Sequence, residues 1–418
     1  MYEFQKLKNG VKVCYVPLEH TKSVTVLVMY AVGSRDESEK LSGASHFIEH
    51  LMFKGTKKRK NTLILTREID RLGAEYNAFT SKEYTGYYIK SDSSYIQKSL
   101  DILSDMLFDS LFLAREMERE KKVIVEEIKM YNDNPMMNID TVFENVLYKN
   151  ALGRDIAGTV ENVLSFKRDD VLKFKDKFYQ PKNMTIVVAG NLDDNIKKYI
   201  SEYFEVRQNN KIRKVKMELG VFGSTKKVDR LVVQEKDTSQ AQIMLGFPAF
   251  SRQDKDGKTL SVLNSILGGS MSSRLFMQIR ERRGLAYMVR SGQEKFKDTG
   301  YSFVRVGLDS KNINKTIKIV EKELENIKTK GVSVRELKDV KTRFKGSMSL
   351  SMEDSSAVAS WFAHQIMFMD EIKTPDQVVE EIRGVSLSDV KRVANKIFKP
   401  SKMRLAVIGK INKKEIIF

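Results

Sequence analysis

Residues 46–50 of the 418-residue chain read His-Phe-Ile-Glu-His and hold two of its four histidines. Two imidazoles four residues apart lie one helical turn apart, so both can bind a single metal ion. Glu49 falls on the same face, where its carboxylate can exchange a proton with a water molecule at the open coordination position. The spacing therefore predicts a hydrolytic zinc site with His46 and His50 as ligands and Glu49 as general base. A His/Glu cluster satisfied by internal hydrogen bonds is the alternative, and ligand type alone also admits manganese or cobalt.

The motif needs a helix to present it. Apolar residues around the motif recur at helical spacing, and we expect the helix to open at Gly43 with Ser42 as its cap. A catalytic zinc also needs a third protein ligand. Residues 114–135 predict a second helix, on which Glu127 shares a partly apolar face with Glu120. We therefore expect Glu127 to be the third ligand and Glu120, two turns earlier, to orient or support the site, whereas Glu126 lies on the charged side.

The chain contains an internal duplication. Residues 170–192 and 389–411 align without a gap: each segment reads as an amphipathic helix, a proline break and a strand that ends at a glycine. The same alignment places Ser265, Gly268 and Gly269 opposite His46, Glu49 and His50. Only the first copy has kept the cluster, so we expect the second copy to supply packing, substrate contacts or both.

The duplication and the element order predict an α+β fold. We expect two duplicated domains, each a mixed, mainly antiparallel β-sheet flanked by helices. The predicted divisions are a catalytic zinc-binding domain over residues 1–206, a linker over 207–220, and a second domain without the metal motif over 221–418. A chain of 418 residues is too long for one ordinary core, which agrees with two domains.

Bulk properties narrow the classes of function. One cysteine excludes an internal disulfide framework and suits a reducing compartment. The first 20 residues lack the apolar core of a signal peptide, and no apolar run is long enough for a membrane helix, so we expect a cytoplasmic protein without a membrane span. The net charge of +18 raises the possibility of nucleic-acid binding. Because the lysines are scattered among acidic neighbours, we expect no nucleic-acid partner.

The chain resembles the pitrilysin/insulinase family of zinc peptidases, in the branch of mitochondrial processing peptidase and its bacterial relatives. The resemblance rests on HFIEHLMFKGT, EKKVIVEEIKMYND, RLGAEYNAFTSKEYTGYY and LGGSMSSRLFMQIRERRGLAY, together with the duplicated architecture. It implies one Zn²⁺ per chain, held by His46, His50 and Glu127. It also implies that Glu49 is the general base and that Glu120 supports the ligands.

The family also uses an arginine and a tyrosine from the non-catalytic half to hold the substrate and stabilise the developing oxyanion. Arg280 and Tyr287 match that motif in IRERRGLAY. From the residues alone, the same segment reads as a basic helix end before Gly284. Longer family members place four such domains in one chain, which implies that two copies of this shorter chain complete the site by dimerisation, either with each other or with a related chain.

Residues 73–90 read as two strands joined by a Thr/Ser/Lys turn. In the family, the first strand is an open edge that binds the substrate backbone by strand addition, which would involve Asn77, Ala78 and Phe79. An ordinary sheet hairpin is the alternative. We expect a metalloendopeptidase that hydrolyses peptides or unfolded segments held as an extended strand in an enclosed cavity. A specific presequence-processing peptidase and a non-catalytic structural subunit of the same fold are the alternatives.

Overall fold

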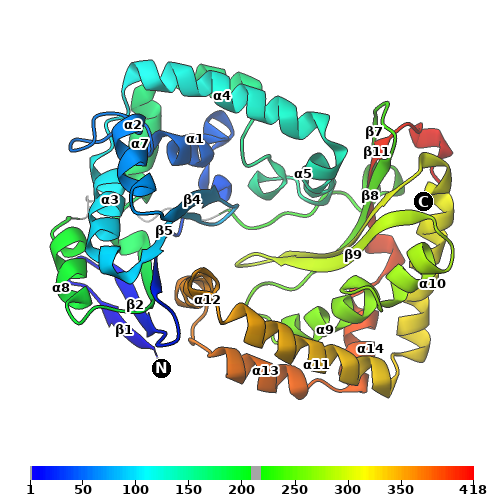
Figure 1. Cartoon of the computed structure of the whole chain (residues 1–418). Helices are drawn as coiled ribbons and strands as arrows, with labels where there is room; N and C mark the ends of the chain where they lie inside the picture. Colours follow the sequence, from blue (N-terminus) through cyan, green and yellow to red (C-terminus); the bar gives the residue numbers. More distant parts are fainter. Residues whose placement is uncertain (1, 209–217) are drawn as a thin grey trace. The chain divides into compact units, whose positions relative to one another are not determined.

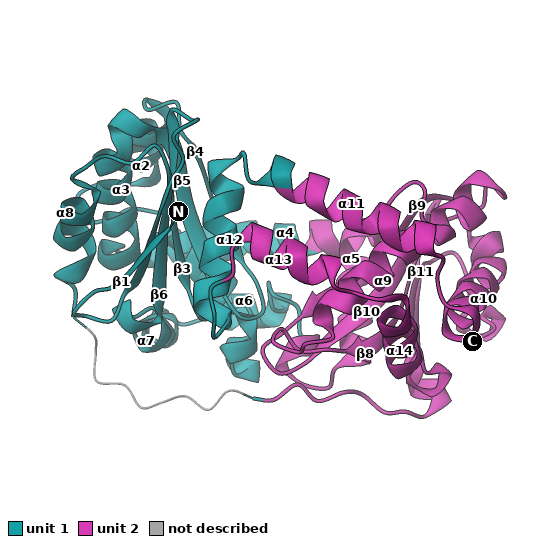
Figure 2. Ribbon diagram, turned by 90° about the horizontal axis from the view of Figure 1, so that it is seen from below, with its two compact units in different colours: residues 1–128, 154–218, 349–372 teal, residues 129–153, 219–348, 373–418 magenta. Residues whose placement is uncertain are grey.

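The computed structural model describes residues 2–208 and 218–418 (Figure 1). They form two compact units, which Figure 2 colours separately. Unit 1 comprises residues 1–128, 154–218 and 349–372, and unit 2 comprises residues 129–153, 219–348 and 373–418. Of the predicted linker 207–220, residues 209–217 lie outside the described residues.

A six-stranded mixed sheet forms the centre of unit 1, in the order β1-β2-β6-β3-β5-β4. Its strands are β1 (Glu3–Lys6), β2 (Lys12–Pro17), β3 (Ser23–Tyr30), β4 (Glu75–Thr80), β5 (Thr85–Asp92) and β6 (Met184–Gly190). The β2–β6 pair is parallel and the other pairs are antiparallel. β4 is the last strand of the sheet, so one of its backbone edges has no partner strand among the described residues.

The helices of unit 1 are α1 (Ala44–Leu51), α2 (Thr62–Asp70), α3 (Ile96–Asp109), α4 (Ala114–Asp133, which continues into unit 2), α6 (Val160–Ser165), α7 (Arg168–Phe178), α8 (Ile196–Ile200) and α12 (Ser355–Phe368). Side chains of β3 alternate between the two faces of the sheet. Val24, Val26 and Val28 join the core that contains α1 and α3, whereas Leu27 and Met29 pack with α12. β-branched and apolar residues on both faces suit a strand covered on both sides.

Unit 2 repeats this sheet with five strands in the order β7-β11-β8-β10-β9. The strands are β7 (Leu231–Glu235), β8 (Ala241–Ala249), β9 (Ala286–Lys295), β10 (Gly300–Leu308) and β11 (Arg404–Gly409). The β7–β11 pair is parallel and the other pairs are antiparallel, as in the corresponding part of unit 1. Its helices are α5 (Pro135–Leu147), α9 (Gly257–Gly268), α10 (Ile313–Lys330), α11 (Val334–Ser351, which ends in unit 1), α13 (Pro375–Arg383) and α14 (Leu387–Ile397).

Each sheet is covered on one face by a helix from the other half of the sequence. α12 follows unit 2 segments along the chain, yet Val358, Phe362 and Ile366 pack on the unit 1 sheet. In the reciprocal arrangement, α5 precedes the second half, yet its apolar residues pack against β8, β10 and β11 of unit 2. The two units are therefore built from interleaved segments of the chain (Figure 2).

The predicted fold class is confirmed: both sheets are mixed, mainly antiparallel and flanked by helices. The two aligned segments also have the same local structure, because α7 and β6 correspond to α14 and β11, with a 3₁₀ turn at Pro181 and at Pro400. The predicted division into domains over residues 1–206 and 221–418, with a linker over 207–220, stays a prediction. In residues 2–208 and 218–418, no helix is both long and apolar enough to cross a membrane.

Candidate metal centre

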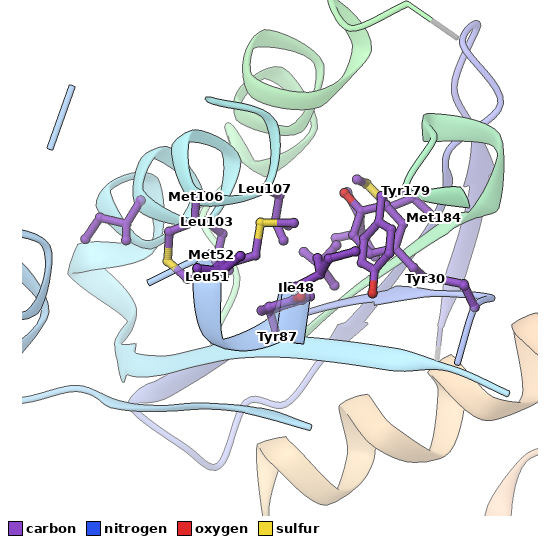
Figure 3. Close-up of a cluster of buried hydrophobic side chains, with 14 of the residues drawn as sticks. Tyr30, Ile48, Leu51, Met52, Tyr87, Leu103, Met106, Leu107, Tyr179 and Met184 are labelled. Atoms are coloured by element: carbon purple, nitrogen blue, oxygen red, sulfur yellow. The ribbon is translucent and has the colours of Figure 1, made fainter. Parts of the chain in front are cut away.

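α1 carries three of the predicted site residues. Phe47, Ile48 and Leu51 are fully buried, so the helix is anchored to the core on that side. Figure 3 shows this anchor inside the cluster whose labelled members are Tyr30, Ile48, Leu51, Met52, Tyr87, Leu103, Met106, Leu107, Tyr179 and Met184. His46, Glu49 and His50 lie on the remaining, half-buried side. Packing thus fixes which face of α1 presents the chemistry.

The start of α1 differs from the prediction. The N-cap is Gly43, with φ of 97°, rather than Ser42. The carboxylate of Glu37 takes over the capping role: its Oε2 accepts from the Gly43 N–H and its Oε1 from the Ser45 N–H, both at 2.7 Å. Gly43 needs to be a glycine because of this left-handed conformation and because a Cβ there would lie 2.4 Å from the Ala157 carbonyl oxygen.

The structure brings His46, His50 and Glu127 together. Their ligand atoms all lie within 4.8 Å of one another. His50 Nε2 is 3.4 Å from one carboxylate oxygen of Glu127, and His46 Nε2 is 3.7 Å from the other. Zinc bonds of about 2.0–2.2 Å in a tetrahedral arrangement separate two ligand atoms by about 3.4 Å. Two imidazoles and one carboxylate at these separations fit a zinc ion with a position left for water.

Glu120 supports His50 from the other side of the ring. Its Oε1 accepts a hydrogen bond from His50 Nδ1 at 2.8 Å, and its Oε2 is 2.7 Å from the Nζ of Lys54. Burial favours the neutral carboxyl, but these two partners outweigh it and lower the pKa of Glu120 below its usual range. Burial also opposes charge on His50, yet the Glu120 hydrogen bond raises the pKa of that imidazole. This bond fixes Nε2 as the free nitrogen of His50.

His46 has a different environment. Burial, together with the neighbouring His50, lowers the pKa of His46 to about 3, so the imidazole is neutral near pH 7. Within the described part of the chain, its Nδ1 is buried and has no hydrogen-bond partner. Burial likewise raises the pKa of Glu127 above its usual range. A divalent cation between these groups would compensate the half-buried carboxylate of Glu127, which supports the fit of a metal ion.

Glu49 is held by a residue from the edge strand. Thr80, the last residue of β4, donates from Oγ1 to Glu49 Oε2 at 2.5 Å. Burial raises the pKa of Glu49, while the Thr80 hydrogen bond acts in the opposite direction. A partly buried carboxylate with a raised pKa suits a group that accepts and then returns a proton.

The other predicted residues of unit 1 lie along β4. Asn77 is exposed, and its Oδ1 accepts from the N–H of Ala78 at 2.8 Å. That N–H is thus occupied by a side chain, which an added strand has to displace to form a backbone bond. Phe79 is half-buried and packs across Gly86 of β5.

Arg280 and Tyr287 lie together in unit 2. The Arg280 guanidinium stands 4.8 Å from the ring centre of Tyr287 and donates to its carbonyl oxygen at 3.0 Å. It also lies 4.8 Å from the ring centre of Phe276. Tyr287 is 73% exposed. The two residues form one local pair, with Arg280 in the π-helical turn η8 (Phe276–Glu281) and Tyr287 in β9.

The structure adds three residues to those inferred from the sequence. Lys54 lies four residues after His50, so one-turn spacing was a signal for it. Thr80 lies two residues after Ala78 on β4, so both side chains point to the same face of the sheet, the face toward α1. Glu37 carries no local signal, because its partners are backbone N–H groups.

Comparisons with known proteins agree with this fold. Residues 12–160 match the family model for insulinase (peptidase family M16), and residues 165–344 match the model for the peptidase M16 inactive domain. Among curated proteins, the uncharacterized zinc protease YmxG of Bacillus subtilis is 34% identical over 94% of this chain and 94% of its own length. An uncharacterized zinc protease of Streptomyces coelicolor is 34% identical over 98% of this chain and 90% of its own length.

Solved structures are also similar. A protease from Helicobacter pylori superimposes with a TM-score of 0.91 at 26% identity, over 98% of this chain and 99% of that one. A peptidase M16 inactive domain structure from Pseudomonas fluorescens gives a TM-score of 0.89 at 19% identity, over 98% of each chain. The second likeness concerns the fold alone.

Proposed function

We propose that this chain, which belongs to the insulinase family of M16 peptidases, is a zinc-dependent metalloendopeptidase. Its substrates are peptides or unfolded segments bound as an extended strand. The observation that carries the proposal is the convergence of His46 and His50 of α1 with Glu127 of α4, whose ligand atoms lie within 4.8 Å of one another. Glu49 lies on α1 beside the two histidines. Bound zinc would supply Lewis acidity toward water and toward the peptide carbonyl.

The chain's own residues account for the proton transfers. Glu49 accepts a proton from the water whose oxygen attacks the peptide carbonyl carbon. When the C–N bond breaks, the same carboxyl returns the proton to the leaving nitrogen, which departs as an amine. Thus one group serves as base and then as acid. Burial raises its pKa, which suits a group that returns the proton it has accepted.

Substrate binding uses the open edge of β4 in this proposal. A peptide that adds as a strand forms backbone hydrogen bonds, which require an extended segment but no particular sequence. Asn77, Ala78 and Phe79 would line that strand. Displacement of the Asn77 side chain from the Ala78 N–H is part of the binding step. A segment whose backbone groups are already paired in its own fold is not free to add in this way, so unfolded segments are the expected substrates.

Arg280 and Tyr287 would stabilise the oxyanion that develops on the carbonyl oxygen. We propose that the pair acts on the zinc site of a second copy of the chain, in a homodimer. The exposed Tyr287 ring and its contact with the Arg280 guanidinium support a preformed donor pair. Removal of a donor of this kind costs about 10²–10³-fold in kcat.

The decisive experiment combines metal analysis with hydrolysis of a quenched fluorogenic peptide. We expect one zinc per chain in the wild type. Glu49→Gln should retain zinc and lose about 10²–10⁴-fold in kcat, because only the proton carrier is removed. Glu127→Gln should lose zinc and activity, whereas its neighbour Glu126→Gln, on the exposed face of α4, should keep both. Undiminished hydrolysis by Glu49→Gln would rule out the mechanism, and a zinc-loaded but inactive wild type would favour a non-catalytic subunit.

A further inference from the structure

Thr80 joins two parts of the candidate site that the sequence motif leaves separate. Its side chain contacts Glu49 of α1, and its backbone ends the edge strand β4. Within the described residues, the bond from Thr80 Oγ1 is the one hydrogen bond of the Glu49 side chain. It occupies Oε2 and leaves Oε1 available for a second partner.

The sheet fixes the Thr80 hydroxyl in place. Thr80 is the register partner of Thr85 in β5, and the Ser81 N–H donates to the Tyr84 carbonyl to close the turn between the strands. Thr85 is fully buried and donates from its own hydroxyl to the Val32 carbonyl at 3.0 Å. A β-branched side chain on a strand also has few rotamers to choose from. Thr80 is therefore a rigid donor rather than a side chain that follows Glu49.

The bond is of the strong kind. A hydroxyl that donates to a carboxylate at 2.5 Å is a charge-assisted hydrogen bond, about twice as strong as a neutral one. Glu49 has three rotatable side-chain bonds and, among the described residues, no other hydrogen bond to its carboxylate, so loss of the hydroxyl would free the carboxylate to rotate. A catalytic base needs a fixed position, because a misplacement of about 1 Å can cost about 100-fold in rate.

We propose that Thr80 is a positioning residue for the general base. It holds one oxygen of Glu49 so that the other faces the water, and it ties the base to the strand on which the peptide is bound. The bound peptide backbone and the Glu49 carboxylate are thereby both positioned by β4. This inference rests on the proposed peptidase function and concerns kcat rather than substrate or zinc binding.

Three variants test it with the same fluorogenic peptide. Thr80→Val keeps the shape and removes the hydroxyl; we expect kcat to fall about 10- to 100-fold, with KM within about twofold and one zinc per chain. Thr80→Ser keeps the hydroxyl and should stay within about threefold of the wild type. Thr66→Val is the matched control, since Thr66 donates to the Thr62 carbonyl within α2, and it should match the wild type. Thr80→Ala repeats the test if Thr80→Val does not fold.

Several results would overturn the inference. Thr80→Val with the kcat of Thr66→Val would remove any role in positioning. A rise in KM alone, or loss of zinc in parallel with activity, would assign Thr80 to binding or to structure. A Thr80→Ser variant as slow as Thr80→Val would show that the methyl group matters and not the hydroxyl. A wild type that hydrolyses no peptide would overturn the peptidase proposal itself, and this inference with it.

Discussion

The Nδ1 of His50 donates to Oε1 of Glu120 at 2.8 Å, and this bond leaves the ligand nitrogen of His50 free. Glu120 is the buried member of the pair, with 4% of its side chain exposed. Replacement of Glu120 by glutamine keeps the shape but removes the charge that stabilises the donating ring.

We expect Glu120→Gln to bind zinc about 10- to 100-fold more weakly than the wild type. Competition with a chromophoric chelator measures this change without any peptide. Glu118→Gln is the control, because Glu118 lies on the same helix, is 69% exposed and pairs with Lys121. Equal zinc affinity in the two variants would contradict a supporting role for Glu120.

Gly43 should tolerate no side chain. Gly43→Ala adds both left-handed strain and a Cβ at 2.4 Å from the Ala157 oxygen, so we expect a loss of at least about 3 kcal/mol in the free energy of unfolding. Gly73→Ala provides the comparison: Gly73 also has a positive φ, of 61°, but apart from its chain neighbours no described residue has an atom within 4 Å of its would-be Cβ. That variant should lose only about 1 kcal/mol. Urea titrations measure the free energy of unfolding of both variants. Equal losses in Gly43→Ala and Gly73→Ala would contradict the clash at Gly43.

Asp256 should make the stability of unit 2 depend on pH. Hydrogen bonds from Arg392 and Lys396 of α14 lower the pKa of Asp256 to about 2, from an ordinary value of 3.8. A depressed carboxyl pKa contributes stability that is present above the unfolded-state value and is lost as the pH falls through the folded-state value. The window for this group is therefore about pH 4 down to pH 2.

We expect Asp256→Asn to lower the free energy of unfolding by about 1–2 kcal/mol at pH 7. The difference from the wild type should shrink as the pH falls from about 4 to about 2, because the wild-type carboxyl then becomes protonated. Denaturant titrations at several pH values measure both effects. A difference that stays constant with pH would assign the loss to shape rather than to charge.

The proposed dimer can be tested by mixing two inactive variants. Glu49→Gln lacks the base and Arg280→Ala lacks the oxyanion donor, so each alone should be nearly inactive. If the Arg280 side chain acts on the site of the other copy, a mixed dimer contains one complete site. Random mixing should then restore about a quarter of the wild-type activity.

The matched control replaces Arg280→Ala by Arg283→Ala, which should be active alone because Arg283 is bonded locally to Gln278. No recovery in a mixture shown by light scattering to contain dimers would exclude a shared site.

Much of the candidate site could be predicted because it depends on local periodicity. The choice of Glu127 over Glu126 needed only the helical period of residues 114–133, and the structure places Glu127 beside the histidines and Glu126 at the surface. The hairpin of β4 and β5 also followed from alternating side chains and a turn. The roles of these residues remain predictions.

Other features depend on contacts that no local pattern encodes. The cap on α1 comes from Glu37, and its partners are backbone groups that every residue carries. The sequence also does not reveal on which sheet α12 packs, because apolar periodicity shows that a helix is buried on one side but not which sheet covers it. The sequence predicts that Thr80 lies in a hairpin, but its bond to Glu49 requires the packing of α1 on β4.

Because α12 packs on the unit 1 sheet and α5 on the unit 2 sheet, neither unit can be completed from one half of the sequence. Leu27 and Val187 precede most of unit 2 in the sequence, yet the residues that bury them, Val358 to Ile366, leave the ribosome only after residues 219–348 of unit 2. Until then, one face of the sheet that carries the proposed peptide-binding edge stays uncovered on the nascent chain. Unit 1, which carries the candidate metal centre, is therefore complete only after most of unit 2 has been translated. A chain terminated before residue 355 would lack α12 and present an apolar sheet face to chaperones and proteases.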